Sequence, residues 1–248
     1  MGRDKDVWEN LGISDPYYAV ATFDNFRSAA IDEEARREFF ESGSRHVAEV
    51  WSEIESRFDV ELRPKHALDY GCGVGRISLP MAAKCGSVTG VDISRAMLDE
   101  TRRNMTEKGI ENISLQTTEE FENADADIYD FVHTYIVLQH VNPSVGCGII
   151  EKITQRLAPG GFGMIHITHT NLSSPLRRLR FTIYRDVPFV HRFLNALRGR
   201  SKPLMPMYEY DRDRVRGILD ANACTARFEV PTDHGFLGEM IFFRKSSV

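Results

Sequence analysis

The sequence of 248 residues has no apolar run of about 18 residues, the length that a transmembrane helix needs. Its four cysteines are scattered and form no Cys-x-x-Cys pair, which argues against a zinc site or a disulfide framework. The charged start of the chain leads to no apolar core, so we expect no secretory signal. These absences predict a cytoplasmic protein with reduced thiols and no metal.

The chain also lacks an excess of basic over acidic residues. The net charge is −5 and the isoelectric point is about 5.9, whereas a dedicated nucleic-acid binder is usually basic. The chain is 42% hydrophobic and 27% charged, which suits a protein with a full core. Its length suits one domain with an appendage. We therefore expect a globular protein without nucleic acid as a partner.

Residues 1–60 read as an N-terminal cap or helical segment. Residues 1–31 mix aromatic and polar side chains and predict an irregular stretch. A long helix is expected from Asp32 to Phe58, because Asp32 can cap it and apolar residues then recur at helical spacing. The main domain is expected to occupy residues 61–248.

Within residues 61–248, short apolar strands alternate with helices. Strands are expected at 66–70, 87–92, 113–117, 130–137 and 161–168, and helices at 75–84, 94–108 and 144–157. A helix near 211–221 precedes two runs, 225–231 and 236–244, that a short turn joins into an antiparallel hairpin. The pattern predicts an α/β fold with a doubly wound, mostly parallel sheet.

The passage from Asp69 to Arg76 carries the strongest functional signal. Glycines alternate at Gly71, Gly73 and Gly75, which lets the backbone turn tightly and approach a ligand closely. The expected helix then directs its free N–H groups toward that ligand. At the end of the second strand, Asp92 can accept both hydroxyls of a ribose. The two features predict a site for a nucleoside-containing cofactor.

Two cofactors fit these residues, a dinucleotide or S-adenosylmethionine. The dinucleotide fingerprint Gly-x-Gly-x-x-Gly requires a third glycine where this chain has Arg76. Asp69 before the loop would repel a pyrophosphate but suits a cationic amino group. The residues therefore favour S-adenosylmethionine over a nicotinamide dinucleotide, the cofactor of an oxidoreductase.

Four stretches together resemble the class I S-adenosylmethionine-dependent methyltransferases. The stretch Leu-Asp-Tyr-Gly-Cys-Gly-Val-Gly-Arg resembles their first motif, and Val-Thr-Gly-Val-Asp-Ile-Ser-Arg-Ala-Met-Leu resembles the second. Residues 129–141 are similar to their fourth-strand region, and Leu-Ala-Pro-Gly-Gly to the turn before the fifth strand. The resemblance implies seven strands in the order 3-2-1-4-5-7-6, with strand 7 antiparallel.

The resemblance also implies roles for particular residues. The loop backbone borders the methionine and ribose portions, Asp69 lies near the amino group, and Asp92 takes the ribose hydroxyls. Ile93, Met97 and Thr118 are candidates for contact with the adenine, although plain helix–sheet packing also explains Ile93 and Met97. The full set of cofactor-binding candidates is Asp69, Gly71, Cys72, Gly73, Gly75, Arg76, Asp92, Ile93, Met97, Thr118 and Tyr135.

The reaction centre is expected beyond the fourth strand, at Tyr135 and His140. Histidine titrates near neutrality and suits a base that removes a proton from an acceptor hydroxyl. The competing interpretation is that His140 only hydrogen-bonds backbone at a helix start. The Asn-Pro-Pro-Tyr motif typical of amino-group methylation is missing, since Leu-Gln-His stands there. This favours oxygen on a small molecule as the acceptor atom.

Residues 172–207 interrupt the alternation and are expected to form a lid inserted after the fifth strand. They hold eight basic residues and one acid, a net charge of +7, with aromatic residues interleaved. This predicts an acidic, phosphorylated, sugar-linked or lipid-linked acceptor, and it also permits peripheral membrane contact. A solvated basic face is the plain alternative. A catalytically degenerate fold that serves as a sensor or partner-binding module is the alternative to an enzyme.

Overall fold

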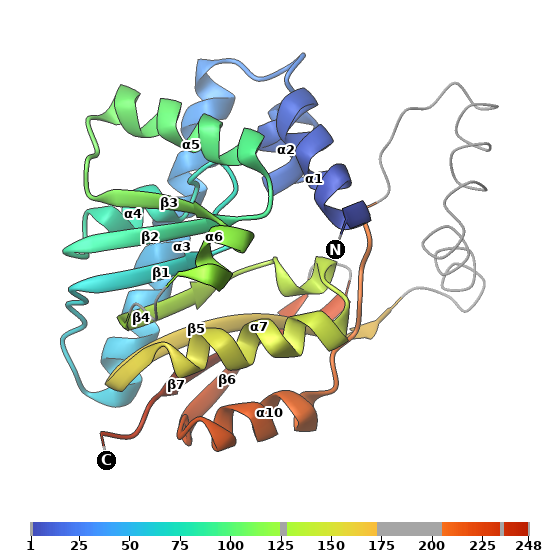
Figure 1. Cartoon of the computed structure of the whole chain (residues 1–248). Coiled ribbons are helices and arrows are strands. Elements are labelled where there is room, and N and C mark those ends of the chain that lie inside the picture. The colour runs from blue at the N-terminus through green and yellow to red at the C-terminus, as the bar shows by residue number, and fades with distance from the viewer. Residues whose placement is uncertain (1, 125–127, 173–204, 234–235, 248) are drawn as a thin grey trace.

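The computed structural model describes residues 2–124, 128–172, 205–233 and 236–247 of the chain. Seven strands form one sheet in the order β3-β2-β1-β4-β5-β7-β6 (Figure 1). The strands are β1 (His66–Tyr70), β2 (Ser87–Asp92), β3 (Ile113–Thr117), β4 (Tyr129–Thr134), β5 (Leu157–Asn171), β6 (Ala226–Asp233) and β7 (Phe236–Arg244). β7 runs antiparallel to both β5 and β6, whereas β1 to β5 pair in parallel. The expected fold class and strand order are confirmed.

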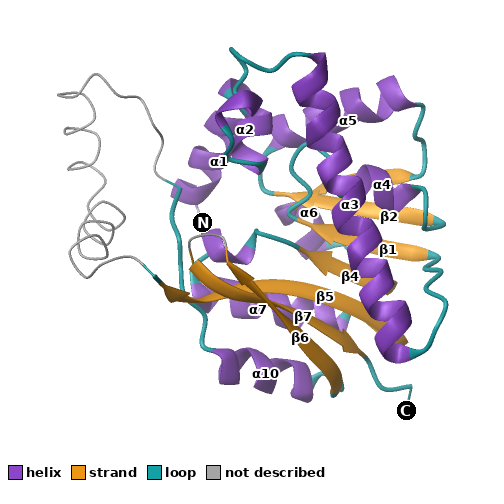
Figure 2. Cartoon of the chain, turned by 180° about the vertical axis from the view of Figure 1, so that it is seen from behind, coloured by secondary structure: helices purple, strands orange, loops and turns teal. Residues whose placement is uncertain are grey.

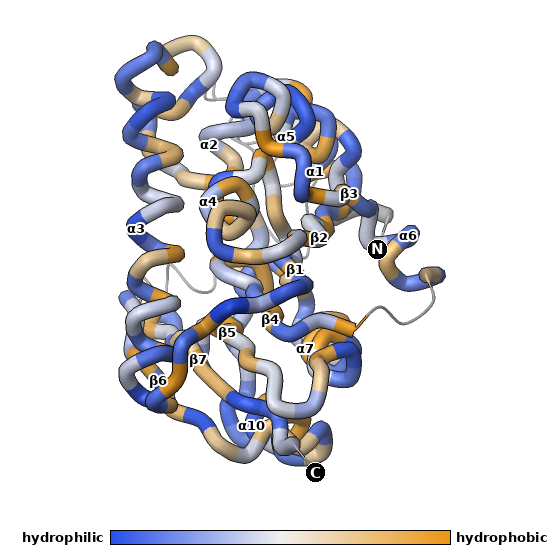
Figure 3. Tube along the Cα trace, turned by 90° about the vertical axis from the view of Figure 1, so that its left-hand side faces the viewer, coloured by the Kyte–Doolittle hydropathy of each residue, from blue (hydrophilic) through white to orange (hydrophobic). Residues whose placement is uncertain are grey.

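Helices cover both faces of the sheet (Figure 2). One apolar cluster includes residues of α3 (Glu33–Phe58), α4 (Ser78–Ala82) and α5 (Arg95–Lys108), together with residues of the N-terminal helices. The helices with residues in the second cluster are α6 (Thr118–Asn123), α7 (Pro143–Gln155) and α10 (Arg212–Ala221). The two groups stand on opposite sides of the strands when the sheet is viewed from its edge (Figure 3).

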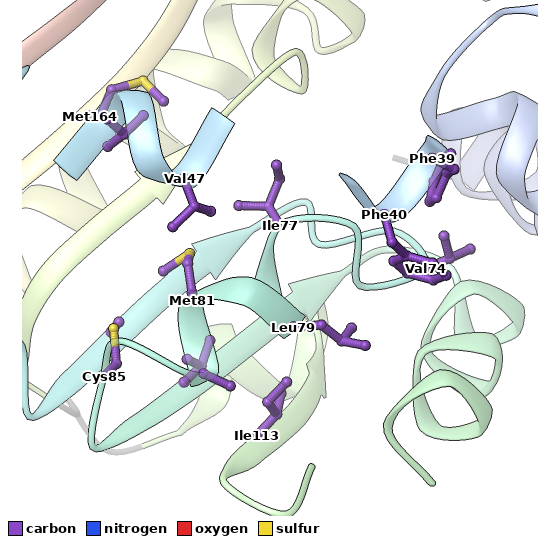
Figure 4. Close-up of a cluster of buried hydrophobic side chains, with 14 of the residues drawn as sticks. Phe39, Phe40, Val47, Val74, Ile77, Leu79, Met81, Cys85, Ile113 and Met164 are labelled. Carbon is purple, nitrogen blue, oxygen red and sulfur yellow. The ribbon is translucent and has the colours of Figure 1, made fainter. Parts of the chain in front are cut away.

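The first cluster joins the N-terminal helices to the sheet. Val47 of α3 lies beside Ile77 and Met81, and Phe40 of α3 lies beside Val74, in a cluster whose members are fully or almost fully buried (Figure 4). Burial of such side chains stabilises the folded state by about 1.5–3 kcal/mol each. The long N-terminal helix is therefore part of the core that holds the glycine loop.

Residues 1–31 differ from the irregular stretch that the sequence predicts. They contain α1 (Gly2–Ser14), α2 (Pro16–Val20) and a single 3-10 turn, η1 (Asp24–Phe26). α1 lies against α5, where a Cβ on Gly12 would come within 2.8 Å of the Ser94 hydroxyl. Tertiary contact with a distant helix stabilises α1, and local sequence pattern does not report such contact.

Other element boundaries also shift. The helix expected at 75–84 is shortened to α4, because the chain continues as turns through residue 77. α6 follows β3 directly through a capping box, in which Thr117 accepts from the Glu120 N–H and Glu120 accepts from the Thr117 N–H. In the described part of the chain, no helix has the length and apolar character needed to cross a membrane.

Candidate active site

One cavity of about 840 Å³ opens at the carboxyl ends of the central strands. This edge is where ligands bind in doubly wound α/β folds. Its walls come from the loop after β1, the end of β2, the segment after β4, and the N-terminal elements α1 to α3. Of the residues expected from the sequence, it brings together Gly71, Cys72, Gly73, Arg76, Asp92, Ile93, Met97, Thr118, Tyr135 and His140.

The glycine loop requires glycine for reasons of conformation and space. Gly71 has a φ of 82° and Gly73 a φ of 55°, in the left-handed region that other residues rarely adopt. A Cβ on Gly71 would lie 2.2 Å from the Val137 side chain, and one on Gly73 would lie 2.6 Å from Val20. The loop is thus held between the segment after β4 and α2, with its backbone along the cavity.

Asp92 presents a half-buried carboxylate to the same cavity. One of its oxygens, Oδ2, accepts from the Gly73 N–H at 2.9 Å, and Oδ1 accepts from the Ser94 N–H at 2.9 Å. Burial raises the pKa of this carboxyl to about 6, against the opposing effect of the two backbone donors. Each oxygen retains a lone pair, so the carboxylate can accept two further hydrogen bonds from a diol.

Asp69 and Gly75 do not line the cavity, unlike the other candidates. The buried Asp69 carboxylate accepts from Ser78 Oγ at 2.5 Å through Oδ2 and from His133 Nδ1 at 2.9 Å through Oδ1. The register explains the second contact, because Asp69 on β1 lies directly opposite His133 on β4. Both carboxylate oxygens of Asp69 therefore accept hydrogen bonds inside the fold. The negative charge of Asp69 lies next to the glycine loop but outside the cavity lining.

His133 continues this chain of hydrogen bonds to α3. Its Nε2 lies 3.0 Å from Nε2 of His46, which is also buried. Since Nδ1 of a neutral His133 donates to Asp69, its Nε2 must accept, and His46 must donate through Nε2. The His46 ring in turn stacks on Tyr135, with the ring centroids 3.9 Å apart. Asp69 is therefore linked through two histidines to a residue of the cavity wall.

The sequence pattern permits a pairing of His133 with a neighbouring helix but does not identify the partner, because His46 lies in a helix 87 residues earlier in the sequence. The one usable signal is the pairing of β1 with β4, which places Asp69 beside His133 once the strand order is known.

Tyr135 lies at a strained turn beyond β4. The next residue, Ile136, has a φ of 60°, a conformation that β-branched residues rarely adopt. Tyr135, Ile136 and Val137 all line the cavity. Strained backbone of this kind persists where the surrounding structure over-determines it, and it is concentrated at functional sites.

His140 ends a 3-10 turn, η2 (Leu138–His140), on the cavity wall. Its Nδ1 lies 2.7 Å from the Pro206 carbonyl, to which it donates, and its Nε2 lies 3.1 Å from the Gln139 amide nitrogen. Burial lowers the pKa of His140 to about 4, below the near-neutral value that the sequence suggested. The ring is thus neutral at pH 7, with both nitrogens hydrogen-bonded.

The segment 172–207 lies mainly outside the described residues, since only 172 and 205–207 of it are described. Its end belongs to the cavity, because Met205 and Met207 line the wall and the Pro206 carbonyl holds His140. Among the described residues, no group of three or more His, Cys, Asp and Glu side chains is placed to hold a metal ion.

Comparison with known proteins identifies the domain. Residues 67–161 match a family described as "Methyltransferase domain". The chain is 34% identical over 110 residues to a ubiquinone biosynthesis O-methyltransferase of Shewanella pealeana, covering 44% of this chain and 45% of that protein. A ubiquinone biosynthesis O-methyltransferase of Coxiella burnetii is 34% identical over 104 residues, or 41% of this chain and 43% of that protein. The match thus spans less than half the length of these relatives.

Solved structures share the fold at low sequence identity. Magnesium protoporphyrin IX methyltransferase from Synechocystis PCC 6803 with bound S-adenosylhomocysteine superposes with a TM-score of 0.64 at 17% identity, covering 98% of each chain. The N-methyltransferase NodS from Bradyrhizobium japonicum, in complex with S-adenosylhomocysteine, gives a TM-score of 0.57 at 15% identity, covering 93% of this chain and 98% of its own. Residues 67–161 thus match a methyltransferase domain, and the strand order of the sheet is that of the solved methyltransferase structures.

Proposed function

We propose that the protein transfers the methyl group of S-adenosylmethionine to an oxygen of a small-molecule acceptor. The proposal rests on one cavity that is lined by two sets of residues. The glycine loop and Asp92 form one part, and Tyr135, His140 and Arg76 form another. A volume of about 840 Å³ is near the upper end of the range of about 300–1,000 Å³ for small-molecule sites.

The cofactor fits the residues of the first part. Asp92 has free lone pairs for the ribose hydroxyls, and the positive-φ glycines leave the loop open to close approach. Ile93 and Met97 supply apolar surface for the adenine, and Thr118 at the start of α6 lies on the same wall. When bound, S-adenosylmethionine supplies an electrophilic methyl group.

The protein's task at the reaction centre is to align the acceptor and to accept the proton of its hydroxyl. The Tyr135 ring stacks on the His46 ring and borders the cavity, so Tyr135 can orient the acceptor. His140 is neutral at physiological pH, although its Nε2 is shared with Gln139. We propose that His140 accepts a hydrogen bond from the acceptor hydroxyl through Nε2, which requires the Gln139 amide to give up its contact with that nitrogen. The names of the relatives, which are O-methyltransferases, support oxygen as the acceptor atom.

The buried basic side chain of Arg76 lines the cavity and supports an acceptor with acidic or phosphate character. The positive charge of residues 172–207 supports the same property and also a sugar-linked or lipid-linked acceptor or peripheral membrane contact. Sedimentation with anionic vesicles tests the membrane proposal. Binding that persists when residues 173–204 are deleted would contradict it.

The activity is tested with methyl-labelled S-adenosylmethionine and a panel of hydroxylated aromatic acids, each paired with its neutral analogue. We expect label in an alkali-stable ether, since methyl esters are cleaved by alkali, and faster transfer to the acidic member of each pair. Asp92→Asn is expected to abolish transfer, and Arg45→Met, at an exposed cavity residue, is the matched control. Tight binding of S-adenosylhomocysteine without transfer to any extract of the source cell would instead support a degenerate binding module.

A further inference from the structure

Arg76 is a buried cation without an ionic partner in the described part of the chain. Its side chain is only 9% exposed, and its Nε is buried with no hydrogen-bond partner there. Nη1 donates to Ser42 Oγ on α3 at 3.3 Å, and no described carboxylate lies within ion-pair distance of the guanidinium. Burying an unpaired charge is costly, so the arrangement calls for an anion.

The backbone and neighbouring rings fix the position of this guanidinium. A Cβ on Gly43 would lie 1.9 Å from the Arg76 carbonyl oxygen, so α3 packs directly on the Arg76 backbone. The centre of the guanidinium lies 6.0 Å from the centroid of the Tyr135 ring. Arg76, Ser42 and Tyr135 all line the cavity. The cation is thus pre-positioned beside the proposed reaction centre.

The nearby acids are already engaged elsewhere. Both Asp69 oxygens accept from Ser78 and His133, and both Asp92 oxygens accept from backbone N–H groups. Glu38, four residues before Ser42 on α3, accepts from the Asn25 amide at 3.2 Å. Burial lowers the pKa of Arg76, while Tyr135 and Asp69 raise it, so the free protein holds this charge against a desolvation penalty.

We propose that Arg76, held by Ser42, is the anion-binding residue of the cavity and receives a carboxylate. The identity of the bound molecules rests on the proposed function. The carboxylate belongs either to the methionine portion of the cofactor or to an acidic group of the acceptor. Among the described residues the Arg76 guanidinium makes no hydrogen bond through Nε, and its bond to Ser42 uses Nη1. A planar guanidinium can hold a carboxylate through two parallel hydrogen bonds, from Nε and Nη2.

The first arm of the test measures equilibrium binding of S-adenosylhomocysteine and of its decarboxylated analogue. Wild-type protein is compared with Arg76→Met, and Arg45→Met is the control because Arg45 is an exposed cation on the same cavity. If the cofactor supplies the carboxylate, Arg76→Met weakens S-adenosylhomocysteine binding about 10- to 100-fold. Binding of the decarboxylated analogue is then the same in both proteins.

The second arm titrates benzoate, a small carboxylate probe, into protein saturated with S-adenosylhomocysteine. If the acceptor supplies the carboxylate, benzoate binds the wild type and Arg45→Met but not Arg76→Met, and S-adenosylhomocysteine affinity is unchanged. The proposal is overturned if Arg76→Met alters neither S-adenosylhomocysteine nor benzoate binding. Failure of the wild type to bind S-adenosylhomocysteine would overturn the proposed function instead, and benzoate binding to the free protein would then decide the role of Arg76.

Thermal unfolding of the cofactor-free proteins separates loss of binding from loss of fold. Because Arg76 has no ionic partner to lose, Arg76→Met is expected to melt at or above the wild-type temperature. Arg76→Lys keeps the charge without the planar fork and is expected to show a smaller loss in whichever arm responds. If Arg76→Met fails to fold, Arg76→Lys decides: unchanged binding in both arms overturns the proposal.

Discussion

If Asp92 holds the ribose of the cofactor, as we propose, its carboxyl group should make cofactor binding depend on pH. In the free protein its pKa is about 6, raised from 3.8 mainly by burial. Ribose hydroxyls can donate to the carboxylate but compete with the proton of the neutral acid, so binding favours the ionised form. The free protein therefore holds a proton that the bound protein releases, and affinity falls as pH drops through 6.

The size of the effect follows from the titration. At pH 5 about one tenth of Asp92 is ionised in the free protein, so S-adenosylhomocysteine should bind about tenfold more weakly than at pH 8. At pH 6 binding should release about half a proton per molecule. His140 has a pKa of about 4 and is already neutral across this window.

Isothermal titration calorimetry in two buffers of different ionisation enthalpy measures both quantities. Asp92→Asn is expected to bind weakly and without the pH step, because an amide does not titrate. Affinity that is constant from pH 5 to 8, or that falls as pH rises, would refute the assignment of Asp92 to the ribose.

The same pKa affects stability. Since the folded-state pKa lies above the unfolded value, the ionised carboxylate opposes folding above pH 6, and this cost disappears below the unfolded pKa. The shift of about two units corresponds to at most about 3 kcal/mol, reduced by water in the cavity. Through this group, the free energy of unfolding of the cofactor-free protein should therefore decrease as the pH rises from 4 to 6.

Three substitutions test the surrounding structure. Gly71→Ala forces a Cβ against Val137 at a positive φ, so it should cost about 1–3 kcal/mol of unfolding free energy and most of the cofactor affinity. Wild-type values in urea unfolding and in S-adenosylhomocysteine titration would contradict this prediction. His133→Phe leaves Oδ1 of the buried Asp69 carboxylate without a donor and should lower the free energy of unfolding in urea by about 2–4 kcal/mol; a loss below about 1 kcal/mol would show that this oxygen finds another partner. The buried Tyr17 hydroxyl of α2 donates to Glu100 of α5 at 2.8 Å, so Tyr17→Phe should cost about 1 kcal/mol of unfolding free energy by the same assay; an unchanged midpoint would show that the hydroxyl contributes no net stability.

The sheet could be predicted because its signals are local. Each central strand is a short apolar run next to a turn, and caps mark the helices: Asp32 accepts from the Ala35 N–H at 2.8 Å, as expected. The first helix of the domain was predicted too long, because residues 75–84 contain Gly75 at a positive φ of 87° and the chain stays in turns up to α4. Periodicity does not resolve such a turn within an otherwise helical pattern.

The direction of the Asp69 side chain relative to the cavity could not be predicted from the sequence. Its place before the glycines suggested contact with the cofactor, yet its side chain is directed to Ser78 and His133, which lie behind the loop. Alternation along a strand fixes which face a side chain takes. It does not fix which polar neighbour on that face will hold it, because that neighbour comes from another strand or helix.

The two halves of the proposed reaction therefore differ in how they are encoded. The cofactor half depends on backbone conformation at Gly71 and Gly73 and on one carboxylate at a strand end, all within about 20 residues whose geometry is local. The acceptor half is assembled from α1, α2, α3 and residues 205–207, which approach each other only in the folded chain. Substitutions in the loop should thus impair every methyl transfer alike. Substitutions at Tyr135, which we propose orients the acceptor, should instead change which acceptor is used.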